Sequence, residues 1–249
     1  VVPVINQLRA AADFDVVAIS QDWHPHVHCS FYECFSNGAL PAPLYPGEDP
    51  ETINTAKLLD EVALTAPSDA SGAEAKRMPQ ILWPRHCVQG TWGACCHPDL
   101  DVGEDDLRVY KGTNACVDSY SAFYDNSKLQ ETSLLHELNE RGVTHVYICG
   151  LALDVCVAYT AFHAQEAGFA TTVVKDACRG VDLERIGHQV AKMKAAGIQI
   201  VTSERVPDLL RRDQATSLDE AILAAMEYHV SRTGIGVADC GPGHGRLSK

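Results

Sequence analysis

Short runs of apolar residues alternate along the chain with segments whose apolar residues recur every three or four positions. The runs are rich in Val and Ile and predict five strands that are apolar on both faces, at 14–20, 107–112, 144–150, 170–176 and 197–203. Residues 156–168 and 183–197 predict helices that each end at a glycine. This order predicts an α/β fold with a mostly parallel sheet and helices on both faces.

Two segments interrupt the alternation. Residues 35–80 begin rich in Pro and Gly and end small and polar, so we predict an inserted surface excursion with one helix near Ile53 to Leu64. From about residue 206 to 249, one amphipathic stretch and a Gly-rich tail predict a C-terminal appendage. We therefore expect residues 1–249 to form a single domain, and the role of the excursion stays open.

The composition excludes several classes of protein. A formal net charge of −13 argues against nucleic acid as a partner, because nucleic-acid binding depends on clustered Lys and Arg. No apolar run approaches the roughly 18 residues of a membrane helix. We expect a small-molecule substrate, and whether the protein is a homo-oligomer is left open.

The ten cysteines are irregularly spaced, and no signal peptide precedes them. They predict thiols in a reducing compartment, so the cytoplasm is the expected location. The final Ser248 and Lys249 would complete a peroxisomal signal only if a Leu followed.

Histidines and an aspartate cluster directly after the first predicted strand. Asp22 and His24 could bind one ion together, and His86 could add a third ligand with open positions left, which suits zinc or iron. The alternative is a solvated His-rich loop, but the Trp and Pro on either side of His24 favour a ligand. His26 and His28 cannot both join without strain, and His26 is the expected bystander.

A cysteine and a lysine follow two other predicted strands. Cys156 lies where a strand turns into a helix, so its sulfur would lie near a helix N-terminus that favours the thiolate. Backbone N–H groups at such a turn can receive an oxyanion. Lys111 could hold the thiolate. The alternatives are a buried cysteine that serves only as a small apolar residue and a surface lysine.

Four blocks together resemble the isochorismatase-like cysteine hydrolases and, within them, the nicotinamidases. The blocks are DWHPHVHCSF, WPRHCVQGTWGA, VYKGTNACVDSYSAF and GLALDVCVAYTAFHAQEAG, in the family's order. The resemblance covers roughly residues 1–203 apart from the excursion. It implies a three-layer sandwich and hydrolysis of nicotinamide to nicotinate and ammonia through a cysteine thioester, a step of NAD salvage.

The resemblance also implies roles for individual residues. Cys156 matches the nucleophile and Lys111 the catalytic lysine. Ala152 matches the position of a cis peptide whose N–H joins the oxyanion hole, and Trp83 and Tyr120 match the aromatic walls of the substrate pocket.

The resemblance assigns the metal ligands as well. Asp22, His24 and His86 match them, and His28 matches a histidine that ligates in some members only. Zinc is the expected ion, with iron and manganese left open, and it is implied to receive the ring nitrogen of the substrate.

One departure from the family is serious. The family has a catalytic aspartate in a D-x-Q-x-D-F segment on its first strand, and this chain has none; Asp13 and Asp15 are in the wrong place. We expect an N-terminal edge of roughly 20 to 30 residues to be missing, judged from typical strand and connection lengths. Without it the chain would be impaired or inactive.

Two alternatives remain. One is another isochorismatase-like amidase, which activity without metal would favour. The other is a catalytically dead scaffold that binds a partner through the excursion.

Overall fold

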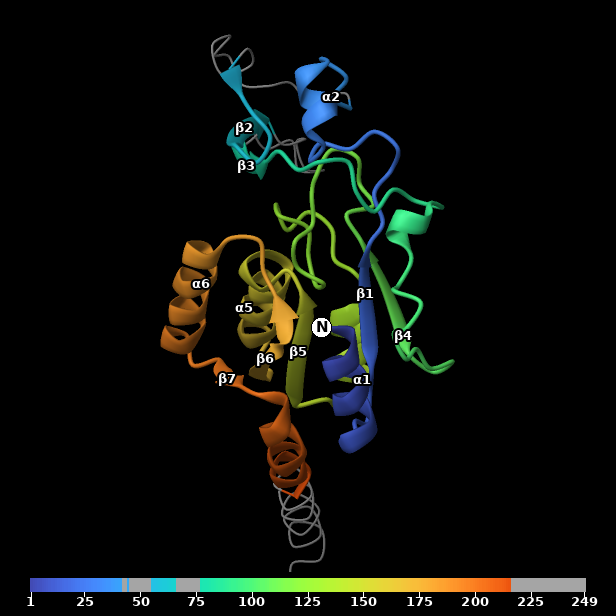
Figure 1. Cartoon of the computed structure of the whole chain (residues 1–249), viewed down its shortest axis with the longest axis vertical. Coiled ribbons are helices and arrows are strands. Elements are labelled where there is room, and N and C mark those ends of the chain that lie inside the picture. Colours follow the sequence, from blue (N-terminus) through green and yellow to red (C-terminus); the bar gives the residue numbers. More distant parts are fainter. Residues whose placement is uncertain (42–43, 45–54, 66–76, 216–249) are drawn as a thin grey trace, which may run out of the picture. The chain divides into compact units, whose positions relative to one another are not determined.

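The computed structural model describes residues 1–41, 44, 55–65 and 77–215 (Figure 1). The chain divides into two compact units, Val1–Asp208 and Leu209–Lys249, and every feature below belongs to the first. The amphipathic stretch and the Gly-rich tail predicted near the C-terminus begin after residue 215 and lie outside the described residues.

Parallel strands form two ladders. In the first, β1 (Ala18–Asp22) pairs with β4 (Leu107–Lys111) in a register that places Asp22 beside Lys111. In the second, the strand order is β5 (His145–Leu151), β6 (Ala170–Arg179) and β7 (Gln199–Val201). All five strands that the apolar runs predict are present, although the first begins at Ala18 and not at Phe14.

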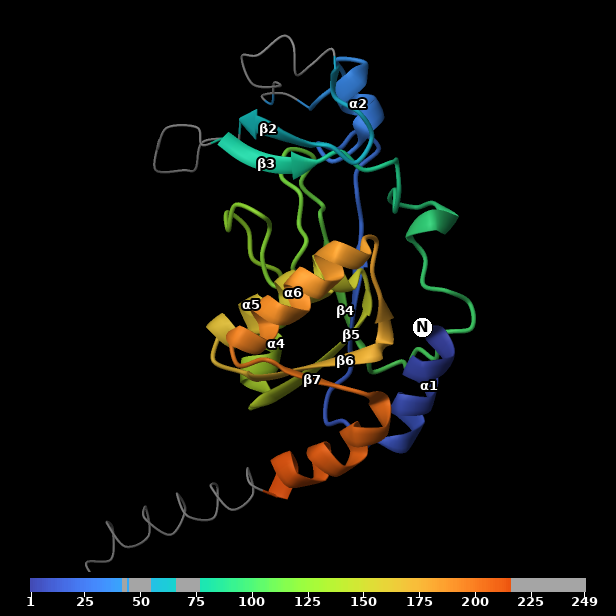
Figure 2. The ribbon, with the colours of Figure 1, turned by 60° about the vertical axis from the view of Figure 1, so that its left-hand side comes forward.

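Helices cover both faces of the β5–β6–β7 sheet (Figure 2). On one face, α5 (Ala158–Glu166) and α6 (Leu183–Ala195) pack against Val173. On the other, α1 (Val2–Ala11) packs against Val174. Successive strand residues point to opposite faces, which is why β6 is apolar at both positions. The predicted α/β architecture with helices on both faces is confirmed.

A third apolar cluster joins the two ladders. It combines Val109 from β4, Val146 and Ile148 from β5, and Leu134 and Leu138 from α4 (Leu134–Glu140). The predicted helix ends are also confirmed, since the glycines that follow α5 and α6 have positive φ angles, as C-terminal caps require.

The excursion contains a hairpin where the sequence predicted a helix. β2 (Glu61–Thr65) pairs antiparallel with β3 (Arg77–Ile81), so the helix predicted near Ile53 to Leu64 is wrong from Glu61 onward. The physical reason is a period of two: Val62 and Leu64 are buried and their neighbours face outward. Both pack with Phe35 of α2 (Tyr32–Ser36) in a small apolar core.

Unit 1 also contains short helical turns at Trp92–Ala94, Leu153–Val157 and Ser203–Arg205, and residues 206–215 are helical. Within the described ranges, no helix is long and apolar enough to cross a membrane.

Candidate active site

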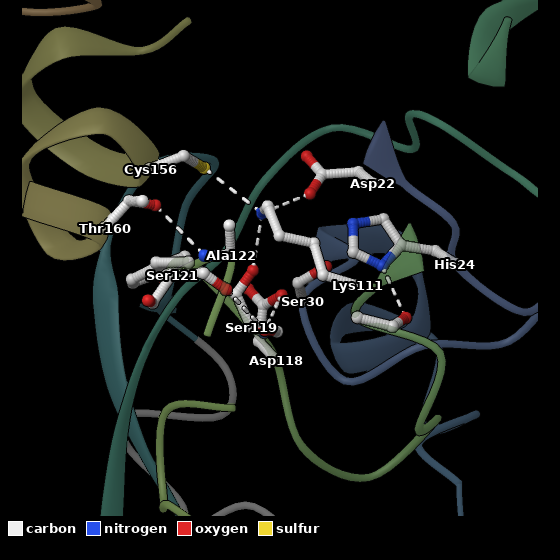
Figure 3. A network of polar contacts seen from close by, with 12 residues as sticks. Asp22, His24, Ser30, Lys111, Asp118, Ser119, Ser121, Ala122, Cys156 and Thr160 are labelled. Carbon is white, nitrogen blue, oxygen red and sulfur yellow. Dashed lines mark hydrogen bonds and ion pairs between the residues drawn. The ribbon is translucent and has the colours of Figure 1, made fainter. Parts of the chain in front are cut away.

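The carboxyl ends of β1, β4 and β5 bring three predicted site residues together (Figure 3). The Lys111 Nζ forms an ion pair with the carboxylate of Asp22 and lies 3.5 Å from the Cys156 Sγ. It also donates to the backbone carbonyl of Ser119, at 2.6 Å. Lys111 is 5% exposed, so the alternative of a surface lysine is wrong.

Cys156 lies in a tight turn between β5 and α5. The peptide bond from Leu151 to Ala152 is cis, at the position that the resemblance indicated, and a single π-helical turn follows at Leu153–Val157. The Ala152 carbonyl accepts from the N–H groups of Val155 and Val157, each at 3.0 Å, but not from the N–H of Cys156. Turns of this kind occur often at functional sites.

Asp154 fastens this turn to the segment that begins α6. Its buried carboxylate accepts from the backbone N–H groups of Val181 (2.9 Å) and Asp182 (3.1 Å) and from the Nε of Arg185 (2.9 Å). Burial raises the pKa of Asp154, but these donors outweigh it, so the pKa is lower than usual. The turn that carries the cysteine is therefore bonded through Asp154 to the start of α6.

The metal ligands suggested by the sequence lie in one group. Donor atoms of Asp22, His24 and His86 all lie within 4.8 Å of one another. The Nε2 atoms of the two histidines are 3.3 Å apart, and the Nε2 of His86 is 4.0 Å from the Oδ2 of Asp22. Asp22 therefore faces Lys111 with its Oδ1 and His86 with its Oδ2.

The hydrogen bonds of the two histidines show that this group fits a cation. The Nδ1 of His24 lies 2.9 Å from the Gly112 carbonyl, and the Nδ1 of His86 lies 2.8 Å from the Pro84 carbonyl. Only a protonated nitrogen can face a carbonyl, so each neutral ring presents a lone pair at Nε2. Two lone pairs and a carboxylate oxygen then face one point, which is a donor set for zinc or a similar ion.

A second, fully buried group lies next to the first. Donor atoms of His24, His28 and Asp118 lie within 4.8 Å of one another. The rings of His24 and His28 stack with centroids 4.1 Å apart, and the Nε2 of His28 has no hydrogen-bond partner among the described residues. Burial lowers the pKa of His28 to about 4, so this ring is neutral.

Burial and charge act in opposite directions on the reactive residues. Burial raises the pKa of Cys156 to about 11, although Lys111 acts against the rise. Burial also disfavours the charged lysine, but Asp22 and Cys156 more than offset this, so the pKa of Lys111 is raised. The lysine is thus protonated and, among the described residues, is the cation in contact with the sulfur.

The two aromatic residues suggested by the sequence lie together. The Trp83 Nε1 donates to the Tyr120 hydroxyl at 3.4 Å, and Tyr120 packs edge-on against Tyr159 with ring centroids 5.3 Å apart. Burial raises the pKa of the Tyr120 hydroxyl, which is therefore neutral.

Sequence reasoning missed two residues at this site. Asp118 was passed over although it stands in the block that follows Lys111, where a charged residue among Val, Ser and Tyr was the available signal. Cys87 directly follows His86, and its φ angle of 46° is unusual for a residue other than glycine. Burial raises the pKa of Cys87 to about 11, and the charges of Asp22, Lys111 and Cys156 also act on it.

Comparison with known proteins agrees with this geometry. A family model described as the isochorismatase domain matches residues 54–205. The chain belongs to the isochorismatase family. It is 38% identical to a nicotinamidase of Acinetobacter baylyi over 207 residues, which are 83% of this chain and 82% of that protein.

Two solved structures are similar as well. The yeast nicotinamidase bound to the inhibitor nicotinaldehyde is 27% identical with a TM-score of 0.66, and the match covers 80% of this chain and 86% of that one. A pyrazinamidase of Pyrococcus horikoshii in complex with zinc is 28% identical with a TM-score of 0.54, over 81% of this chain and 82% of that one.

Proposed function

We propose that the protein hydrolyses nicotinamide to nicotinate and ammonia, a step of NAD salvage. The observation that carries the proposal is the contact between the Cys156 sulfur and Lys111, next to a donor set that fits a metal ion. The similarity to nicotinamidases over four-fifths of the chain supports nicotinamide as the substrate.

Cys156 is the nucleophile of this proposal. Its sulfur bonds to the carboxamide carbon, and the thiol proton leaves with the amide nitrogen as ammonia when the C–N bond breaks. Water then cleaves the thioester, which releases nicotinate and restores the thiol. Lys111, at 3.5 Å, stabilises the sulfur while it carries negative charge.

The backbone around Cys156 receives the charge that develops on the carbonyl oxygen. The Ala152 N–H has no acceptor among the described residues, and the Ala152 carbonyl does not engage the N–H of Cys156. Both groups are therefore placed to act as donors to an oxyanion.

The substrate ring lies, in this proposal, between aromatic residues and the metal group. Trp83 and Tyr120 form its walls. Asp22, His24 and His86 would hold one divalent ion, for which we propose zinc before iron or manganese. When bound, this ion supplies a Lewis-acidic position for the ring nitrogen of the substrate.

Turnover of nicotinamide and of benzamide by the full-length natural protein tests the proposal. Benzamide has the same carboxamide and ring size but no ring nitrogen. We expect nicotinate and ammonia in equal amounts and a clearly higher KM for benzamide. Equal kinetics for both amides would remove the role of the ring nitrogen, and no turnover by metal-loaded, folded protein would exclude nicotinamide as the substrate.

A cytoplasmic location belongs to the same proposal. The nine cysteines among the described residues are all free thiols, which suits a reducing compartment.

A further inference from the structure

Asp118 is a buried carboxylate that forms no ion pair with a described residue. Only 3% of the residue is exposed. Its oxygens accept from two neutral donors, the backbone N–H of Ser119 at 2.8 Å and the Nε2 of Gln80 at 3.1 Å. Buried charges are normally paired or close to a metal, so a positive charge is required nearby.

The position of Asp118 indicates which positive charges it serves. Its carboxylate lies within 4.8 Å of donor atoms of His24 and His28. The next residue, Ser119, accepts a hydrogen bond from Lys111 through its carbonyl. Asp118 thus stands close to His24 of the metal group, and the residue after it contacts Lys111 (Figure 3).

Counting charges shows what this carboxylate contributes. With Cys156 as a thiol, a divalent ion and Lys111 together carry three positive charges, whereas Asp22 carries one negative charge. A buried site with two uncancelled positive charges would bind the ion poorly, because little water is present to screen them. The carboxylate of Asp118 halves this excess of positive charge.

The hydrogen bonds of His24 argue against direct ligation by Asp118. The Nδ1 of His24 faces the Gly112 carbonyl, so only the Nε2 of His24 can bind an ion, and this atom lies 3.3 Å from the Nε2 of His86. Asp118 is not a member of the group formed by Asp22, His24 and His86. An ion between the two Nε2 atoms would therefore feel the charge of Asp118 without bonding to it.

We propose that Asp118 is a positioning residue of the metal centre, whose buried carboxylate supplies the counter-charge that holds a divalent ion at Asp22, His24 and His86. This inference rests on the proposed metal site. The Asp118 carboxylate lies near His24 of the metal group. Its charge also raises the pKa of Cys156, after the larger effects of burial, which raises this pKa, and of Lys111, which lowers it.

The test compares Asp118→Asn with Asp125→Asn. Asp125 lies in the same loop and is 5% exposed. In the described part of the chain, its carboxylate accepts only from the local backbone N–H groups of Ser127, Leu129 and Gln130. Zinc affinity is measured on metal-free protein by competition with a chelator. We expect Asp118→Asn to weaken zinc binding about 10- to 100-fold, as is typical of residues that surround metal ligands, and Asp125→Asn to leave it unchanged.

A second readout separates a charge effect from local damage. In metal-free protein, loss of a negative charge near Cys156 favours the thiolate, so alkylation of this cysteine should begin at lower pH in Asp118→Asn. The other charged groups that act on the sulfur, Lys111 and Asp22, are unchanged in this variant. A collapsed site would also expose the sulfur and speed its alkylation, so the comparison uses Asp118→Asn protein whose near-ultraviolet circular dichroism matches that of the natural protein. In such protein, an unshifted alkylation profile would contradict the charge effect.

A rescue variant moves the negative charge from residue 118 to a side chain next to it in space. Gln80→Glu in the Asp118→Asn background returns a buried carboxylate at a hydrogen-bonded neighbour and should restore most of the zinc affinity. The proposal is overturned by unchanged zinc affinity in Asp118→Asn, by equal losses in both asparagine variants, or by failure of the rescue in a folded protein. If the natural protein binds no divalent ion, the proposed metal site is wrong. This result is distinct from a failure of the role proposed for Asp118.

Discussion

Replacing Lys111 by Met tests the central contact of the site. The change removes the only cation in contact with the Cys156 sulfur among the described residues and keeps most of the buried aliphatic chain. Asp22 and Asp118 remain, and both disfavour a further negative charge on the sulfur. We therefore expect the thiol of Cys156 to lose its proton with much more difficulty than in the natural protein.

The separation of the two atoms sets the size of this effect. Two unit charges about 4 Å apart interact by about 4 kcal/mol at an effective dielectric constant near 20. The Lys111 Nζ and the Cys156 Sγ are 3.5 Å apart, so this value applies to them. It corresponds to about a thousandfold change in the thiolate population, since about 1.4 kcal/mol is a factor of ten. The full value is an upper limit because neighbouring groups reorganise.

The assay is the rate of alkylation of Cys156 in metal-free protein, followed by peptide mass spectrometry between about pH 7 and about pH 9. Burial already raises the pKa of this thiol to about 11, so the natural protein should react slowly in this range and faster with each rise in pH. Lys111→Met should react about 100 to 1,000 times more slowly. Lys128→Met is the control, because Lys128 pairs with Glu166 on the surface.

Loss of a buried lysine also leaves Asp22 unpaired, which costs about 3–5 kcal/mol of folding stability. The double variant Lys111→Met with Asp22→Asn removes both charges and should fold better. Its thiol should react faster than in Lys111→Met but still more slowly than in the natural protein, because Lys111 affects the pKa of Cys156 more than Asp22 does. Alkylation within threefold of the natural rate in a folded lysine variant would refute the reasoning.

Three further predictions concern single positions. His86→Ala should raise KM and lower metal content, whereas His26→Ala, at an exposed histidine, should change neither; unchanged values in His86→Ala would count against its assignment. Gly112→Ala places a Cβ 2.6 Å from the His24 Nδ1. It should lower the free energy of unfolding by about 1–3 kcal/mol, measured by thermal unfolding, and weaken zinc binding, measured by competition with a chelator. Because the pKa of Asp154 is lowered in the folded protein, its carboxylate stabilises the fold above the usual carboxyl pKa, and this stabilisation is lost as pH falls through the lowered value. In urea unfolding, the difference in stability between the natural protein and Asp154→Asn should therefore shrink from about pH 6 to about pH 3.

The strands and the grouping of the site followed from the sequence. Val- and Ile-rich runs identified β4, β5, β6 and β7 closely, because a buried parallel strand needs apolar side chains on both faces. The rule that parallel strands end at one edge placed Asp22, Lys111 and Cys156 near one another, and the structure brings them together.

Other features depend on contacts that no local pattern encodes. The hairpin of β2 and β3 has strands of five residues, too short for its period of two to stand out against a helical interpretation. The role that we propose for Asp118 depends on groups near it in space, which come from residues far away along the chain. The shared use of Asp22 by Lys111 and the histidines is likewise visible only once β1 and β4 pair.

The most direct measurement for the central claim is kcat for nicotinamide in Cys156→Ala beside Cys87→Ala. Both cysteines lie near Lys111, but only Cys156 projects from the turn between β5 and α5. If Cys156 is the nucleophile, its removal should lower kcat by at least about three orders of magnitude, while Cys87→Ala keeps substantial turnover. Comparable turnover in Cys156→Ala and the natural protein would contradict the account.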